Sequence, residues 1–208
     1  NKCWEITANS KKNTFIYKAK DLIYTAPPQS LLSHLKEPLQ RNQSYKNRLN
    51  NLPNPSGAVV FYSALKKEHI KKISSNHYQF VSHEFGSLFV SISDDGDGRA
   101  PKGEVTLIAS IFTKTKDWFD LDKQNYLTRK RYFIEQISLE LESQFDIVPE
   151  NWLHRELATP LGFEKWTNRP NGIVGGLGQN PSIFGLFGLS SRTPFEGLWL
   201  CGDSIYPG

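Results

Sequence analysis

The stretch GLWLCGDSIYPG, residues 197–208, says most about the fold of this chain. Its apolar run Leu198–Cys201 is typical of a buried strand. The glycine–aspartate pair that follows, and then Pro207 and Gly208, are typical of a turn that leads into further structure. The sequence stops there, begins at Asn1 and contains no methionine. We therefore expect a piece of a longer protein.

The composition is that of a globular chain with a mixed surface. The 208 residues are 38% hydrophobic and 12% aromatic, enough for a real core. The net charge of +4 comes from 25 basic and 21 acidic residues scattered along the chain, which predicts no nucleic-acid partner. The longest apolar run, residues 57–65, has about half the length that a membrane-spanning helix needs. Cys3 and Cys201 match neither a disulfide framework nor a zinc-ligand spacing.

The N-terminal part reads as short strands followed by a loop. Three β-prone runs, residues 4–7, 14–17 and 22–25, predict a small β-meander. Pro27 and Pro28 end the third run because proline cannot donate to a sheet ladder. Ser30 can cap a short helix that runs to Leu35. Residues 36–55 are polar and irregular, which predicts a linker or loop.

The middle of the chain predicts a larger sheet and one long helix. Strands are expected at residues 58–65, 78–83, 88–93, 105–112 and 152–158, with 58–65 and 105–112 in the centre because both are apolar on both sides. The helix is expected at residues 124–145, where apolar side chains recur at spacings of three and four. From Thr159 to Leu198, glycine and proline are dense and predict a loop. The fold class is therefore α+β: a mixed, mainly antiparallel sheet covered by helices, with a small meander and a returning strand.

Two motifs that could carry catalysis or a metal fail on spacing. Residues 94–98 begin like a calcium loop, but Arg99 stands at the fifth ligand position and Thr106 where a bidentate glutamate is required, which favours a tight loop between strands. The run 202–206 resembles a nucleophile elbow, but Tyr206 replaces its final glycine. The five histidines form no close pair on a helical face. The sequence therefore predicts no metal site and no catalytic side chain.

A glycine-rich segment, residues 171–188, is similar to a dinucleotide fingerprint but lacks its third glycine, since Pro181 takes that place. Such a segment can lie close against a ligand or against another backbone, and the sequence leaves both open. The sequence likewise leaves two roles open for Asp203. A carboxylate after a strand and a glycine can accept hydrogen bonds from hydroxyl or backbone N–H groups of a ligand, or it can form an ordinary turn.

The run 197–208 resembles the C-terminal signature of FAD-dependent carotenoid desaturases and isomerases, the phytoene-desaturase-related branch of the flavin amine-oxidase superfamily. Residues 158–203, ATPLGFEKWTNRPNGIVGGLGQNPSIFGLFGLSSRTPFEGLWLCGD, look most like its carotenoid 3′,4′-desaturase group. The run DLIYTAPPQSLL, residues 21–32, is similar to the strand by which this superfamily leaves its cofactor domain. The resemblance covers nearly the whole chain and is weakest at residues 38–54.

The resemblance implies a flavoenzyme that desaturates a carotenoid by hydride transfer to FAD. Cofactor binding is carried over to Gly202 and Asp203, followed by Pro207 and Gly208. The chemistry resides in the flavin, so no catalytic side chain is required. The family's N-terminal nucleotide fingerprint is absent from this sequence, so we expect FAD in the parent protein and little binding by this chain alone. Candidates to line a polyene tunnel, with the ordinary core as the alternative, are Phe61, Tyr62, Phe80, Phe89, Trp118, Trp166, Phe184 and Phe187.

The resemblance also implies a domain plan. Residues 1–30 and 166–208 are assigned to an incomplete FAD-binding domain, and residues 31–165 to a substrate-binding domain. The implied location is cytoplasmic with peripheral attachment to a membrane, where carotenoids dissolve. Two other functions remain open: a flavin-dependent cis–trans carotenoid isomerase, and a non-catalytic module that binds an apolar ligand or a membrane surface.

Overall fold

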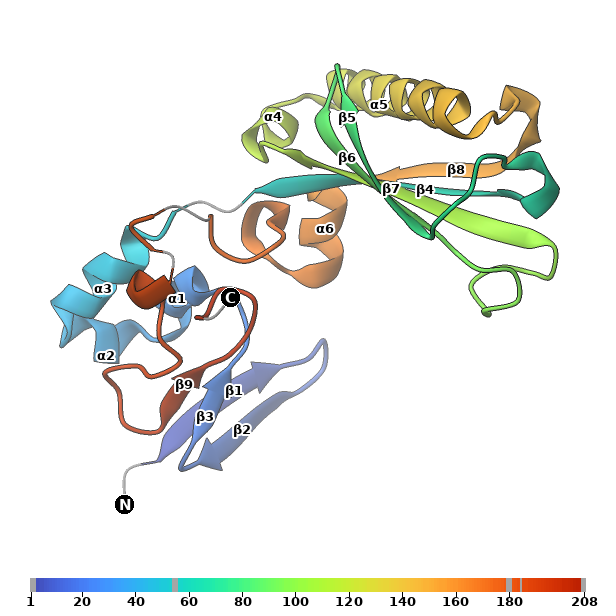
Figure 1. Ribbon diagram of the computed structural model, residues 1–208. Helices are drawn as coiled ribbons and strands as arrows, with labels where there is room; N and C mark the ends of the chain where they lie inside the picture. Colours follow the sequence, from blue (N-terminus) through green and yellow to red (C-terminus); the bar gives the residue numbers. More distant parts are fainter. Residues whose placement is uncertain (1–2, 54–55, 179–180, 184, 207–208) are drawn as a thin grey trace. The chain divides into compact units, whose positions relative to one another are not determined.

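A computed structural model describes residues 3–53, 56–178, 181–183 and 185–206. The chain forms two compact units (Figure 1): one comprises residues 1–55 and 175–208, and the other residues 56–174. We call them the terminal unit and the sheet unit. Residues 31–53 therefore belong to the terminal unit. The domain plan stated above assigned residues 31–165 to one substrate-binding domain, and that plan stays a prediction.

The sheet unit is built on a five-stranded antiparallel sheet in the order β5-β6-β7-β4-β8. Its strands are β4 (Gly57–Lys66), β5 (His77–Ser82), β6 (Gly86–Ile92), β7 (Glu104–Thr113) and β8 (Trp152–Ala158). The strands β4 and β7 lie inside the sheet and pair along their whole length, from Gly57 with Thr113 to Lys66 with Glu104. The predicted central strands and the predicted antiparallel sheet are confirmed.

One face of this sheet is covered by the long helix α5 (Lys123–Phe145), as Figure 1 shows. The predicted apolar stripe of the helix is buried at Phe133, Ile137, Leu141 and Phe145. These side chains pack on alternate residues of the strands, among them Phe61 and Leu107. In β6, Leu88, Val90 and Ile92 are buried while Phe89 is exposed, which is the alternation of a strand with one covered face.

Two short helices of the sheet unit were not predicted from the sequence. They are α4 (Lys116–Phe119) and α6 (Pro160–Thr167), and α6 lies in the stretch predicted to be a loop. Pro160 occupies the first helical position of α6, where a missing N–H costs nothing. Asn168 ends the helix in the left-handed conformation.

The terminal unit contains two small sheets. The strands β1 (Trp4–Asn9) and β2 (Thr14–Ala19) form an antiparallel hairpin, and β3 (Leu22–Tyr24) pairs in parallel with β9 (Leu198–Leu200). The expected three-stranded meander is thus a two-stranded hairpin, and the third run joins the returning strand. Leu22, Tyr24, Leu198 and Leu200 face the core of this unit, which explains the choice of partner.

The stretch predicted as a linker is helical. It contains α1 (Leu31–His34), α2 (Lys36–Gln40) and α3 (Gln43–Asn50). Leu39, Tyr45 and Leu49 are buried against the strands of the same unit. Asn42 caps α3, because its side chain accepts a hydrogen bond from the Tyr45 N–H at 3.0 Å. Single 3₁₀ turns occur at Pro28–Ser30, Lys67–His69, Pro149–Asn151, Pro170–Gly172 and Gly185–Phe187.

Within the described residues, no helix combines the length and apolar character needed to cross a membrane.

Candidate functional site

The candidate site lies where the parallel strands β3 and β9 end. Leu22 is in register with Leu198, and Tyr24 with Leu200. The Cys201 N–H extends this pairing by donating to the Tyr24 carbonyl at 3.0 Å. Parallel strands in α/β folds bind ligands beyond their carboxyl ends, so this edge is where a cofactor is expected.

Gly202 turns the chain immediately after β9. Its φ of +134° lies in a region that side-chain-bearing residues rarely adopt. The Ile205 N–H donates to the Gly202 carbonyl at 3.2 Å and closes the turn. Ile205 is buried in the core of the terminal unit, so the turn is anchored at its far end.

This turn presents Asp203 on the surface, beside the end of β3. Asp203 is exposed and accepts a hydrogen bond from the Ser204 hydroxyl at 3.2 Å. Together with Tyr24, Thr25 and Pro28 it lines a small hollow. The structure therefore brings Gly202 and Asp203 together at this edge, and their role in cofactor binding stays a prediction. Pro207 and Gly208, the other two predicted cofactor residues, lie outside the described part of the chain.

The backbone of the site is held by the glycine-rich segment. Gly176 has a φ of +74°, and a Cβ there would overlap the Asp203 carbonyl group. Gly172, in the sheet unit, lies equally close to the Pro160 carbonyl group. At these two glycines the close neighbour is another stretch of backbone, so backbone packing accounts for the absence of a side chain there.

A tyrosine–histidine pair at this edge was not found by the sequence analysis. The Tyr24 hydroxyl and His34 Nδ1 are 2.8 Å apart, within hydrogen-bond distance. Burial raises the pKa of Tyr24, so the phenol stays protonated at neutral pH. No sequence spacing indicates the pair, because β3 and α1 are joined through a proline turn whose geometry sets the distance.

The predicted tunnel aromatics separate into two groups. Phe61 and Trp118 are fully buried, and Phe80 packs against the same core, so these three belong to the ordinary core of the sheet unit. Exposed are Tyr62, Phe89, Trp166 and Phe187. Phe184 lies outside the described residues.

The acidic loop between β6 and β7 has a structural role. Asp97 accepts hydrogen bonds from the Asp94 N–H at 3.0 Å and from the Arg99 N–H at 2.9 Å. Asp95 accepts from the Gly103 N–H at 2.9 Å. These contacts support the predicted tight loop. Across the ranges that the structure covers, no three His, Cys, Asp or Glu side chains gather in a way that could hold a metal ion.

Comparison with known proteins adds sequence relatives and a similar structure. No protein-family model matches the chain. It is 28% identical over 127 residues to a chloroplastic prolycopene isomerase of Daucus carota, and 26% identical over 139 residues to one of Arabidopsis thaliana. It is 30% identical over 129 residues to prolycopene isomerase 2 of an Oncidium hybrid cultivar. These matches cover 60%, 65% and 60% of the chain but only 20%, 23% and 22% of the relatives, so the chain spans about a fifth of their length.

A crystal structure of an oxidoreductase from Methanosarcina mazei has a similar fold, with a TM-score of 0.50 and 14% identity. The match covers 92% of this chain and 39% of that one. The sequence matches are to prolycopene isomerases and do not single out the carotenoid 3′,4′-desaturase group. The structural match shows a similar fold.

Proposed function

We propose that this chain is part of an FAD-dependent enzyme that either isomerises double bonds of a carotenoid or introduces a new double bond by removing two hydrogens. The observation that carries the proposal is the Gly202–Asp203 turn at the carboxyl end of the parallel pair β3–β9, in a chain similar to prolycopene isomerases. The substrate class comes from those relatives, which are named for prolycopene.

The residues at the turn fit one part of FAD. An exposed carboxylate accepts hydrogen bonds, and the ribityl chain and ribose of FAD offer hydroxyl donors. Gly202 carries no side chain between the strand end and an approaching ligand. The hollow is small, so these residues would hold an edge of the cofactor and position it. When bound, FAD supplies the hydride chemistry, and the role of Asp203 is to orient it through hydroxyl groups.

An apolar surface for a polyene is available on the sheet unit. Tyr62, Phe89 and Phe112 lie on the sheet face opposite α5 and are 39%, 42% and 72% exposed. Val60 and Ile108 lie between them on the same face and are half-buried. Aromatic and aliphatic side chains on one face suit a long hydrocarbon without hydrogen-bonding groups.

Isomerisation is the reaction that the relatives' names favour, and desaturation, which the sequence resemblance placed first, is the second candidate. The two differ in hydrogen balance. Desaturation removes two hydrogens and lengthens the conjugated system, whereas isomerisation leaves the mass unchanged. The intact protein that contains this chain, incubated with prolycopene and either reduced or oxidised FAD, is therefore analysed by chromatography and mass spectrometry. A product of equal mass supports isomerisation, and a lighter product supports desaturation.

The cofactor assignment is tested on the same protein with Asp203→Asn. We expect its FAD affinity to fall by about tenfold or more, because the charged acceptor of the ribityl hydroxyls is lost. Glu37→Gln, an exposed acid of the same unit on α2, is the matched control and should leave FAD binding unchanged. Equal FAD affinity of the wild-type and Asp203→Asn proteins would remove Asp203 from the site.

Peripheral membrane attachment of the intact protein also stays a proposal. Its electrostatic support is limited, because one lysine in each of the basic pairs Lys66–Lys67 and Lys71–Lys72 lies near an acid of the chain. Lys67 lies 3.9 Å from Asp95, and Lys72 lies 2.8 Å from Asp146.

A further inference from the structure

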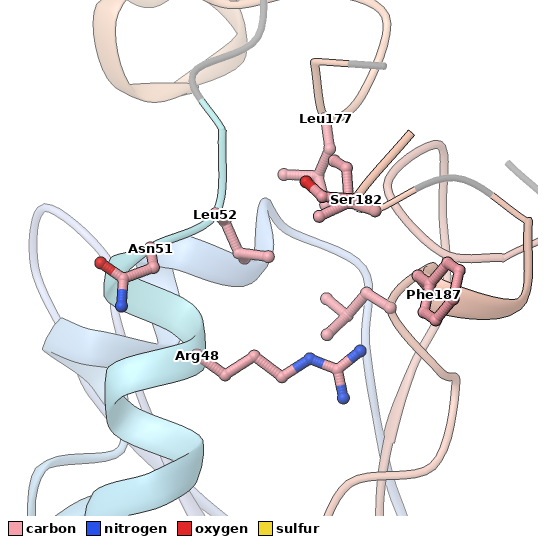
Figure 2. A pocket seen from close by; sticks show the side chains of 8 residues that line it. Arg48, Asn51, Leu52, Leu177, Ser182 and Phe187 are labelled. Atoms are coloured by element: carbon pink, nitrogen blue, oxygen red, sulfur yellow. The ribbon is translucent and has the colours of Figure 1, made fainter. Parts of the chain in front are cut away.

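A second hollow in the terminal unit has a different character from the Gly202–Asp203 edge. It has a volume of about 490 Å³ and lies between the C-terminal half of α3 and the part of the chain that carries Leu177, Ser182 and Phe187 (Figure 2). This volume is within the range of small-molecule binding sites, roughly 300–1,000 Å³. No sequence spacing indicates this pocket, because its walls come from distant parts of the chain.

The walls of this pocket are mainly apolar. They are formed by Leu52, Leu177, Ile183, Phe187 and Leu189. Leu177 and Leu189 are buried in the core of the unit, so they form a fixed wall, while Phe187 is 67% exposed at the other side. A pocket of this kind favours a ligand with an apolar body.

One cation enters the apolar pocket. Figure 2 shows the Arg48 side chain reaching from α3 toward the segment that carries Phe187. Its Nη2 donates to the Gly188 carbonyl at 3.2 Å. Among the residues that the structure describes, no carboxylate lies within ion-pair distance of this guanidinium. A guanidinium has five N–H donors, so most of them remain available to an oxygen-bearing ligand.

We propose that this pocket binds a small amphiphile with an apolar body and a terminal carboxylate, whose oxygens Arg48 holds. A planar guanidinium matches a carboxylate with two parallel hydrogen bonds, and it does so more strongly than a neutral pair because both groups are charged. The apolar walls bind the hydrocarbon part. The inference depends neither on FAD nor on the carotenoid reaction.

Arg48 also has a structural explanation, which the test must separate from ligand binding. It lies in the last turn of α3, where a positive charge interacts favourably with the unpaired carbonyl groups of the helix end. A purely structural role predicts no preference between an acid and an alcohol of the same chain length.

The experiment measures binding of sodium octanoate and of 1-octanol to the 208-residue chain by isothermal titration calorimetry. We expect one saturable octanoate site and an affinity for octanol that is at least about tenfold lower, which corresponds to loss of a charge-assisted pair. Arg48→Gln should reduce octanoate affinity about tenfold or more and leave octanol affinity unchanged. Arg41→Gln, an arginine of the same unit that does not line this pocket, is the matched control.

A measurement on the wild-type chain covers the case in which Arg48→Gln does not fold. Octanoate affinity should fall as sodium chloride is raised, because salt screens the ion pair, while octanol affinity should not fall. Failure of octanoate to bind, equal binding of acid and alcohol, or equal octanoate binding by the wild-type and Arg48→Gln chains overturns the proposal. None of these outcomes bears on FAD binding at Asp203.

Discussion

Two glycines of the terminal unit have a positive φ but different surroundings. Comparing their alanine variants therefore distinguishes the cost of backbone strain from the cost of steric overlap. At Gly176 a Cβ would meet the Asp203 carbonyl group, whereas at Gly185 it would meet open space. Gly185→Ala should therefore lose only the conformational term, about 1–2 kcal/mol. Gly176→Ala should lose clearly more, because the backbone that carries Asp203 must also move. Urea unfolding measures both variants, and equal losses would show that the contact with Asp203 is unimportant.

The charged loop between β6 and β7 makes a pH-dependent contribution. The Arg99 side chain, followed by the Arg99 N–H, lowers the pKa of Asp97 in the folded state. The unfolded carboxyl titrates near pH 3.9, so this contribution is fully present above that value and is lost as the pH falls through the lower folded pKa. We expect the melting temperature of Asp97→Asn to be lower than that of the wild type at pH 7. The difference should vanish at strongly acidic pH. Thermal melts over this pH range test the assignment, and a difference that persists in acid contradicts it.

At the scale of elements, the spacing of apolar residues correctly predicted those helices and strands that short stretches of sequence determine. The strands of the large sheet and the stripe of α5 follow apolar alternation at two residues or at three and four. The helix α3 was missed because only Tyr45 and Leu49 in an otherwise polar stretch are buried, too few for a clear stripe. The pairing of β3 with β9 was missed because strand partners distant in sequence depend on the shared core and not on either strand alone.

The same distinction applies to the candidate site. The strand and the Gly202–Asp203 pair could be located from a short run of residues, so this part was predicted. The backbone of Gly176 behind Asp203 and the pocket around Arg48 require tertiary positions that no spacing encodes.

The start of α5 offers a direct test of an element. Asp122 caps the helix, because its Oδ1 accepts from the Asn125 N–H at 2.9 Å. Asp122→Ala should destabilise the sheet unit by about 1 kcal/mol, since one helix-end N–H loses its partner. Asp122→Asn is the control and should retain most of the stability, because asparagine is an equally good cap. Chemical denaturation followed by circular dichroism measures both, and equal losses in the two variants would mean that charge, not capping, matters.

For the whole molecule, the cores indicate two cooperative units. Phe61, Leu107 and Leu141 belong to a core whose members all lie in the sheet unit, and Leu49 and Leu200 to one whose members all lie in the terminal unit. Each core combines helix and strand side chains, as a unit that folds around its own interior requires. The core of the terminal unit contains side chains from both the first and the last segment of the chain, so it cannot form without β9.

Calorimetry on the 208-residue chain tests this division with one variant in each core. Leu49 and Leu141 are both fully buried, and replacing either by alanine should cost about 2–5 kcal/mol. We expect two thermal transitions, with Leu49→Ala lowering one midpoint by about 10 °C or more and Leu141→Ala lowering only the other. Because the two substitutions are chemically identical, a difference in which transition moves can come only from the core in which each leucine lies. A single transition that both variants lower equally would mean that the two cores unfold as one.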